Sequence, residues 1–214
     1  MHNVRLVGLS PDKVEAFERC MAVGGVALFP ADTVYGLATE PDSAEGVDRL
    51  YALKGRRPDR PAAVMFFRVE LALAALPELE PQTRAALEAL LPGGVTLLVP
   101  NPARRFPLAC ADTPQVLGVR VPALDGALAP LSVVNWPVLQ SSANRTGEAD
   151  ARRVEDVDEG VRAGVDLVLD AGELPGTPST VVDLTAFEGD RSFAVVREGA
   201  VPRDRVEAVL RSCR

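Results

Sequence analysis

Apolar residues gather into short runs that are separated by polar segments rich in glycine and proline, and between these runs lie stretches with helical spacing. Ser10 and Pro11 suit the cap and first turn of a helix, which Gly24 and Gly25 should end. Ser43 suits the cap of a second helix. Together the helical spacing predicts helices near residues 11–23, 43–54, 69–75, 81–91, 124–131, 154–160 and 203–211.

The short apolar runs predict buried strands. The first is Val26–Phe29, which we expect Pro30 to break before a polar loop that holds Asp32 and Thr33. Ligands often bind in α/β proteins where a strand ends in such a loop. The other predicted strands are 62–67, 95–100, 116–122, 165–170, 179–185 and 193–199, and one more begins at Pro137 and runs into a polar loop.

Strands and helices mix along the chain without the strict alternation that a doubly wound sheet requires. The last two strands follow each other closely and should pair as an antiparallel hairpin. The sequence therefore predicts an α/β fold with one open, twisted, mixed sheet flanked by helices. We expect residues 1–214 to form a single domain, with a loop rich in glycine and proline at 171–178.

Composition narrows the class of protein. A hydrophobic content of 47% with 25% charged residues is typical of a globular protein. No apolar run approaches the roughly 18 residues needed to span a bilayer, and the N-terminus lacks the features of a secretory signal, so we expect a cytoplasmic protein without a membrane contact. Three scattered cysteines do not suit a disulfide framework.

His2 is the only histidine, so catalytic triads and metal sites that need histidine are not expected. The net charge of -7 argues against a surface that binds nucleic acid throughout, but it permits a local basic cleft. We predict no resident metal site.

One cationic segment, LYALKGRRPDRPAAVMFF, stands out in this acidic chain because it holds Lys54, Arg56, Arg57 and Arg60. Such clusters are most often solvated surface. Here a glycine and two prolines fix the shape of the loop, and a buried strand follows. A lysine and an arginine two residues apart can both bind one polyphosphate, the lysine as a point charge and the arginine as a fork.

A second polar segment, QSSANRTG at 140–147, follows a predicted strand. Its small hydroxyl and amide groups suit a phosphate, a carbamate or a ribose, although the same residues also suit an ordinary turn. A serine nucleophile is not expected, because the chain lacks both a GxSxG motif and an internal histidine.

Two further arginines lie within predicted strands. Arg120 has apolar neighbours and Arg197 lies near a strand end, so each either pairs with an acid or binds the carboxylate of a ligand. No Walker A loop and no GxGxxG motif occurs, so a nucleotide would be held by side chains from several strands. Hydroxyl groups at strand ends, which also suit capping and β-propensity, belong to Thr33, Tyr35, Ser179 and Thr180.

Seven of these segments, taken together, resemble the YrdC-like threonylcarbamoyl-adenylate synthase family in its short, single-domain form. The matching blocks are FPADTVYGLA, LYALKGRRPDRP, PGGVTLLVP, LGVRVP, QSSANRTG, STVVDLT and VVREGAV, in the order and approximate spacing of that family. The resemblance runs from about Val26 to Val201, which is nearly the whole chain.

The resemblance implies an enzyme that makes threonylcarbamoyl-adenylate from L-threonine, bicarbonate or carbon dioxide, and ATP carrying Mg²⁺, with release of pyrophosphate. Its product would pass to threonylcarbamoyl-transfer proteins that modify tRNA, and the fold would hold a large positively charged cavity. The catalytic KxR and SxN motifs fall on Lys54, Arg56, Ser142 and Asn144. Substrate and ATP contacts fall on Thr33, Arg60, Arg120, Gln140, Ser179 and Arg197, with Tyr35 and Thr180 beside two of them as further candidates.

The chain departs from the family pattern in the region expected to bind threonine. Met65 stands where the family often has histidine, and Ala123-Leu124 stands where Asp-His is common. Arg57 and Ala62 replace a frequent proline and leucine. Two other functions therefore stay open: an RNA-binding module that uses the same concave surface, and transfer of a carbamoyl group from another donor.

Overall fold

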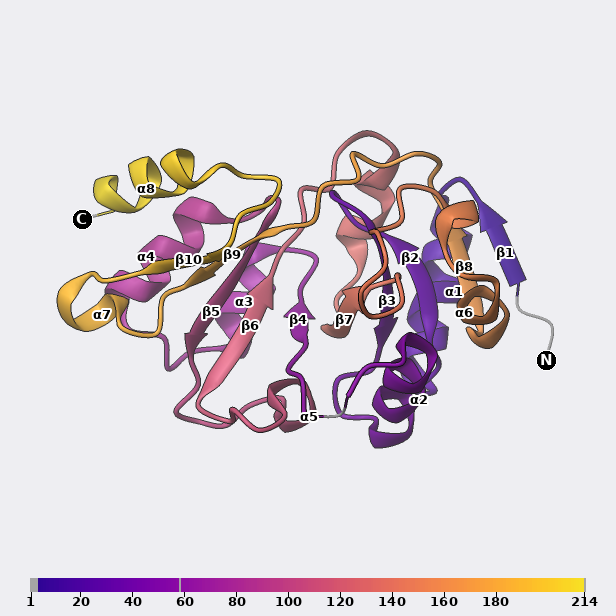
Figure 1. The fold of residues 1–214 in the computed structure, drawn as a ribbon, viewed down its shortest axis with the longest axis horizontal. Coiled ribbons are helices and arrows are strands. Elements are labelled where there is room, and N and C mark those ends of the chain that lie inside the picture. The colour runs from indigo at the N-terminus through magenta and orange to yellow at the C-terminus, as the bar shows by residue number, and fades with distance from the viewer. Residues whose placement is uncertain (1–3, 58, 214) are drawn as a thin grey trace.

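The computed structural model describes residues 4–57 and 59–213, and within them ten strands form one sheet (Figure 1). The order across the sheet is β1-β8-β2-β3-β7-β4-β6-β5-β9-β10. The strands are β1 (Val4–Val7), β2 (Ala27–Pro30), β3 (Tyr35–Thr39), β4 (Ala63–Met65), β5 (Val95–Pro100), β6 (Val116–Arg120), β7 (Val138–Ser142), β8 (Leu167–Asp170), β9 (Thr180–Asp183) and β10 (Ala194–Arg197).

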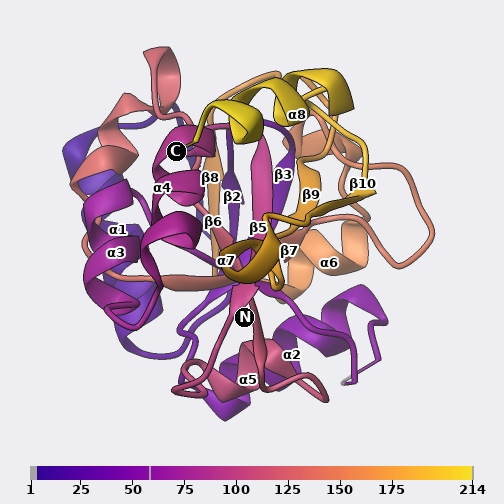
Figure 2. The ribbon, with the colours of Figure 1, turned by 90° about the vertical axis from the view of Figure 1, so that its left-hand side faces the viewer.

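Helices lie on both sides of the sheet when it is seen from its β10 end (Figure 2). Ser43 caps α2 by accepting a hydrogen bond from the backbone of Gly46, as its position predicts. The α-helices are α1 (Pro11–Ala22), α2 (Ala44–Lys54), α3 (Val69–Ala75), α4 (Pro81–Leu90), α5 (Pro107–Cys110), α6 (Glu159–Gly164), α7 (Phe187–Asp190) and α8 (Arg203–Ser212), and the 3₁₀ helices are η1 (Gly126–Val133) and η2 (Val154–Asp156).

The pairing of the strands confirms a mixed sheet. Parallel pairs join β1 to β8, β8 to β2, β4 to β6 and β5 to β9, whereas the other neighbours run antiparallel. The predicted antiparallel hairpin near the C-terminus is β9 with β10. The described cysteines are unpaired thiols, in agreement with the absence of a disulfide framework.

The sequence prediction was wrong in two details near Pro30. Pro30 does not break the first strand, because it is the last residue of β2 and lies opposite Tyr35 of β3. The segment that begins at Tyr35 is a strand instead of a loop. Its five residues are all buried, so it lacks the alternation of polar and apolar residues that identifies a half-buried strand.

Alternate residues of the strands pack into two hydrophobic clusters, as the two-residue period of a strand requires. Leu28 of β2 belongs to the larger cluster, together with residues of α2, α4 and α8. Phe29 belongs to the smaller cluster on the other face, where α1 places Phe17 with its ring centre 5.6 Å from that of Phe29. Helix α1 contacts β8, β2 and β3, so it covers this second face only at one end of the sheet.

Candidate active site

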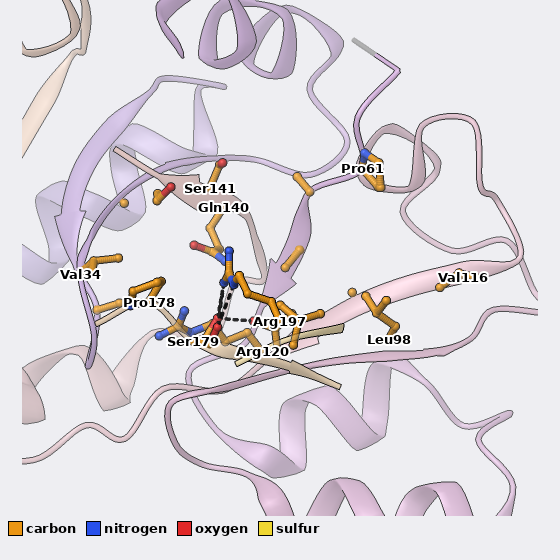
Figure 3. Close-up of a pocket in the computed structure, with 18 of the residues that line it drawn as sticks. Val34, Pro61, Leu98, Val116, Arg120, Gln140, Ser141, Pro178, Ser179 and Arg197 are labelled. Carbon is orange, nitrogen blue, oxygen red and sulfur yellow. Dashed lines mark hydrogen bonds between the residues drawn. The ribbon is translucent and has the colours of Figure 1, made fainter. Parts of the chain in front are cut away.

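The uncovered part of the second face forms the floor of a cavity of about 460 Å³ (Figure 3). Its floor follows one row of register partners, in which Ala63 pairs with Gly118, Gly118 with Leu98, and Leu98 with Asp183. A Cβ atom on Gly118 would lie 3.3 Å from the Cα of Ala63. Ala63 and Gly118, the two small residues in this row, therefore keep this part of the floor low and leave room for a ligand.

Most polar groups at the cavity wall are cations, hydroxyls and one amide. They come from β5, β6, β7, β9 and β10 and from loops, one of which follows α2, so segments far apart in the sequence meet here. The polar residues that line the cavity are Arg56, Thr96, Thr113, Arg120, Gln140, Ser141, Ser142, Ser179, Asp183 and Arg197.

Arg120 is a buried cation that is only partly paired. Its Nη2 donates to Asp32 Oδ1 and to Thr33 Oγ1, both at 2.5 Å. Only 4% of its side chain is exposed, yet its Nε has no hydrogen-bond partner within the described residues. A buried guanidinium nitrogen without a partner is costly, so this edge of Arg120 is suited to an anionic ligand.

Arg197 is fixed by the residue that precedes β9. Its Nη2 donates to the carbonyl oxygen of Ser179 at 2.8 Å, and its Nε donates to the same oxygen at 3.2 Å. The hydroxyl of Ser179 lies 2.8 Å from that of Thr96 on the neighbouring strand. Figure 3 shows Arg197 reaching across the cavity above Ser179.

Arg56 lies two residues after the end of α2, and its side chain extends to β7. Its Nη1 donates to the hydroxyl of Ser141 at 3.2 Å, its Nη2 donates to the carbonyl oxygen of Pro61, and its guanidinium lies 5.7 Å from the ring centre of Tyr51. Burial lowers the pKa of Arg56 from its ordinary value. Its Nε, like that of Arg120, has no partner within residues 4–57 and 59–213.

Lys54 lies behind the cavity wall, at the turn that carries the SxN motif. Its ammonium donates to the carbonyl oxygen of Ser142 and, at 2.7 Å, to that of Asn144. The hydroxyl of Ser142 donates to Asn144 Oδ1. Burial, with the charge of Arg56 as a second cause, lowers the pKa of Lys54 to about 8. Lys54 thus organises this turn, of which Ser142 reaches the cavity.

Six predicted site residues lie outside the cavity lining, namely Lys54, Asn144, Thr33, Tyr35, Arg60 and Thr180. The hydroxyl of Tyr35 donates to the carbonyl oxygen of Gly172 at 2.8 Å and accepts from the backbone of Ala171, and burial raises its pKa. Thr180 holds the chain between β10 and α8. The side chain of Arg60 is exposed on the loop after α2. Of the predicted site residues, the cavity brings together Arg56, Arg120, Gln140, Ser142, Ser179 and Arg197.

The sequence prediction missed several cavity residues, and some of them had a signal. Thr96 is the one polar residue in the apolar run VTLLVP. Asp183 and Val181 share a strand face with Ser179, as the two-residue period of a strand indicates. The small floor residues had no signal, because their role depends on the strands beside them.

Nothing in the described part of the chain resembles a metal site, since no group of three histidine, cysteine, aspartate or glutamate side chains converges within residues 4–57 and 59–213. His2 lies outside these residues. The described helices are also too short or too polar to cross a membrane.

These features define a class of protein: a mixed α/β sheet with a cavity built to hold anions by arginines and hydroxyls from distant strands. The particular family follows from a sequence profile. Residues 19–199 match the family Sua5_yciO_yrdC, described as telomere recombination, and the chain belongs to this family.

Named relatives agree with this assignment. The chain is 32% identical to a threonylcarbamoyl-AMP synthase of Chromohalobacter salexigens over 83% of its own length and 93% of the relative. It is 27% identical to a protein of the same name from Pyrococcus abyssi, over 87% of its own length and 54% of that relative. The chain therefore spans about half the length of some curated relatives that it matches.

The fold is shared with solved structures. The structure of Pyrococcus abyssi Sua5 complexed with L-threonine matches with a TM-score of 0.82 and 25% identity, covering 100% of this chain and 61% of that one. The structure of Escherichia coli YciO matches with a TM-score of 0.73 over 93% of this chain and 95% of that one. At 22% identity the second likeness concerns the fold alone.

Proposed function

We propose that this protein combines L-threonine, bicarbonate or carbon dioxide, and ATP into L-threonylcarbamoyl-adenylate and releases pyrophosphate. The adenylate would then supply the threonylcarbamoyladenosine modification of tRNA through separate transfer proteins. This places the protein in the cytoplasm, as one domain that spans residues 1–214.

One observation carries the proposal: Arg56 and Arg120 line the same cavity, and each has a buried Nε without a partner in the described part of the chain. The reaction brings together two anions, a carboxylate and a triphosphate, that repel each other in water. Arginines on two sides of one cavity can hold both.

The chemistry fits a cavity without a nucleophile. The threonine amine takes up carbon dioxide and loses a proton to form a carbamate. A carbamate oxygen then attacks the α-phosphorus of ATP, a new P–O bond forms, and the bond to the β-phosphate oxygen breaks so that pyrophosphate leaves. Such a transfer needs positioning and charge stabilisation more than covalent help from the protein.

The charged and polar residues take distinct parts in this proposal. Arg56 and the hydroxyl of Ser142 bind the phosphates, and Arg120 with Arg197 binds the α-carboxylate of threonine. Lys54 and Asn144 shape the turn that presents Ser142. Mg²⁺ enters as part of the substrate, bound to the phosphates of ATP, because the described residues offer no cluster of acids for it.

The relatives support the proposal by name, since Pyrococcus abyssi Sua5 was solved with L-threonine and the curated relatives are threonylcarbamoyl-AMP synthases. A second function, an RNA-binding module on the same surface, is less well supported because the chain carries a net charge of -7. Transfer of a carbamoyl group from another donor would need no threonine.

The direct test is to incubate the protein with MgATP, bicarbonate and ¹⁴C-labelled L-threonine and to measure labelled adenylate and pyrophosphate. We expect both products to depend on threonine. Arg56→Ala should reduce their rate at least about 100-fold, since it removes a charge that the transition state needs. Arg57→Ala is the matched control: its side chain is 76% exposed and pairs with Asp59, so its rate should be unchanged. No threonine-dependent product at high protein concentration would refute the proposal.

A further inference from the structure

Asn101 is a buried amide that joins the two ends of the loop between β5 and β6. It is only 1% exposed, and its Nδ2 donates to the carbonyl oxygens of Arg105 at 3.0 Å and of Pro114 at 3.1 Å. Its Oδ1 accepts from the backbone N–H of Arg105 at 2.9 Å. Its backbone N–H donates to the carbonyl oxygen of Gln115 at 2.7 Å. One residue therefore holds the loop 101–115 in its folded shape.

This loop needs such contacts because its backbone is strained. Four non-glycine residues have a positive φ in the described part of the chain, and three of them lie here: Arg104 at 51°, Phe106 at 50° and Ala111 at 47°. Residues with a side chain rarely adopt this left-handed region, and they keep it only where the surrounding structure holds them. Asn101 bonds both backbone groups of Arg105, which lies between two of the strained residues.

The strained loop contains α5, which contacts the chain just before β4. Phe106, directly before α5, packs edge-on against Phe66 with 6.1 Å between the ring centres. The carbonyl oxygen of Ala109 in α5 accepts from the backbone N–H of Ala62 at 2.9 Å. Figure 1 shows α5 beside the chain that leads into β4. The loop therefore fixes the position of the chain at Ala62.

Pro61, the residue before Ala62, is one of two anchors for the guanidinium of Arg56. Its carbonyl oxygen accepts from Nη2 of Arg56, and the hydroxyl of Ser141 accepts from Nη1 at 3.2 Å. Both anchors line the cavity, together with Arg56 itself. A shift of Pro61 would therefore turn the guanidinium of Arg56 away from its place in the cavity.

We propose that Asn101 is a positioning residue for Arg56, and that it acts through α5, Ala62 and Pro61. This inference rests on the proposed function, in which Arg56 binds the phosphates of ATP. Asn101 does not line the cavity, so its effect on ATP passes through other residues. A guanidinium binds phosphate as a fork of fixed geometry, and a small displacement of that fork weakens binding.

The test is a double-mutant cycle of Asn101→Ala and Arg56→Ala. The readout is the Kd of the magnesium complex of α,β-methylene-ATP, an analogue that cannot release pyrophosphate, measured by calorimetry. We expect Asn101→Ala to raise this Kd at least about 10-fold when Arg56 is present and less than about 2-fold in the Arg56→Ala background. A loss of stability alone would raise the Kd by the same factor in both backgrounds.

Thr83→Val on α4 is the control. Thr83 is as buried as Asn101, at 1% exposed, and lies outside the cavity lining. Its substitution should lower the free energy of unfolding and leave the Kd at the wild-type value. Asn101→Ser covers the case in which Asn101→Ala does not fold. It keeps a hydroxyl that can donate to one carbonyl of the loop, so it should raise the Kd by a smaller factor with the same dependence on Arg56.

The outcomes separate this inference from the proposed function, because binding of the analogue does not require synthesis. If wild type binds the analogue but makes no adenylate, and the Kd of the Asn101 variants depends on Arg56, the inference holds and the proposed function fails. If wild type makes adenylate but the Asn101 variants keep the wild-type Kd, or lose affinity equally with and without Arg56, the proposed function holds and Asn101 does not position Arg56.

Discussion

At the scale of single residues, Lys54 makes the stability of the folded protein depend on pH. Its pKa falls from an ordinary value of 10.5 to about 8 because folding buries the ammonium near Arg56. Between these two pH values the unfolded chain holds a proton that the folded chain has lost. Raising the pH through this window therefore favours the folded state, and below pH 8 the full cost of the buried charge applies.

We predict that the free energy of unfolding of wild type rises by about 3 kcal/mol relative to that of Lys54→Met between pH 8 and pH 10.5. Urea unfolding of both proteins at several pH values in this window measures the difference, and groups that titrate alike in both proteins cancel. A constant difference across the window would show that Lys54 keeps its ordinary pKa in the folded protein.

The ion pair between Arg120 and Asp32 gives a second prediction at this scale. The pair is 2.5 Å long with side chains 4% and 9% exposed, whereas Arg57 and Asp59 form a pair of the same length with side chains 76% and 36% exposed. Removing one partner of a buried pair leaves an uncompensated charge, and an exposed pair contributes little. We expect Asp32→Ala to lower the free energy of unfolding by about 3–5 kcal/mol and Asp59→Ala by less than about 1 kcal/mol.

Chemical denaturation of the two variants and wild type decides this point, and equal losses would mean that burial does not set the strength of the Arg120 pair.

The sequence predicted that Arg120 has an anionic partner, but it did not identify that partner. An arginine among apolar neighbours had to pair with an acid or a ligand, but Asp32 is 88 residues away along the chain. Only the fold could identify it.

At the scale of elements, Thr180 joins β9 to the segment that leads into α8. Its hydroxyl donates to the carbonyl oxygen of Val201 and accepts from the backbone N–H groups of Gly199 and Val201 at 2.9 and 3.1 Å. This segment directly follows Arg197. Thr180 therefore holds the end of β10, and with it Arg197, in place over the cavity.

We predict that Thr180→Val lowers the free energy of unfolding by about 2–3 kcal/mol, because the isosteric valine leaves three partly buried backbone groups without a partner. Hydrogen exchange at Gly199 and Val201 should become faster in Thr180→Val and should stay near the wild-type rate in Thr180→Ser, which keeps the hydroxyl. Slow exchange at both positions in Thr180→Val would show that the segment is held by other contacts.

Comparison of the predicted with the observed elements shows which of them local sequence patterns can predict. Helices with a cap and a clear apolar face, such as α2 with Ser43, were predicted within a few residues, since both signals are local. Strand β3 was missed because it is buried on both faces. The region 154–164 was predicted as one helix from 154 to 160, but it divides into η2 and α6, and Asp158 caps the latter.

For the whole molecule, the pairing of strands that lie far apart in the sequence is what sequence patterns cannot predict. The cavity floor needs β4 beside β6, β6 beside β5, and β5 beside β9, an order that no local pattern encodes. Sequence reasoning identified the mixed sheet and six of the residues that meet at the cavity. The place of the small residues Ala63 and Gly118 in the floor, and that of Lys54 behind the wall, follow only from that strand order.

The charge of the whole molecule separates the synthase from an RNA-binding module. Tight binding to RNA relies on cations that neutralise many phosphates, but this chain has 30 acidic and 23 basic residues, and Arg152, Arg153 and Arg211 among others already pair with glutamates. We therefore predict that tRNA binds with a Kd weaker than about 10⁻⁴ M at 150 mM KCl. Fluorescence anisotropy with labelled tRNA at 50, 100 and 150 mM KCl measures this, with excess MgATP added to reveal competition for the cavity. Micromolar binding at the highest salt, displaced by MgATP, would instead support an RNA-binding surface at the cavity.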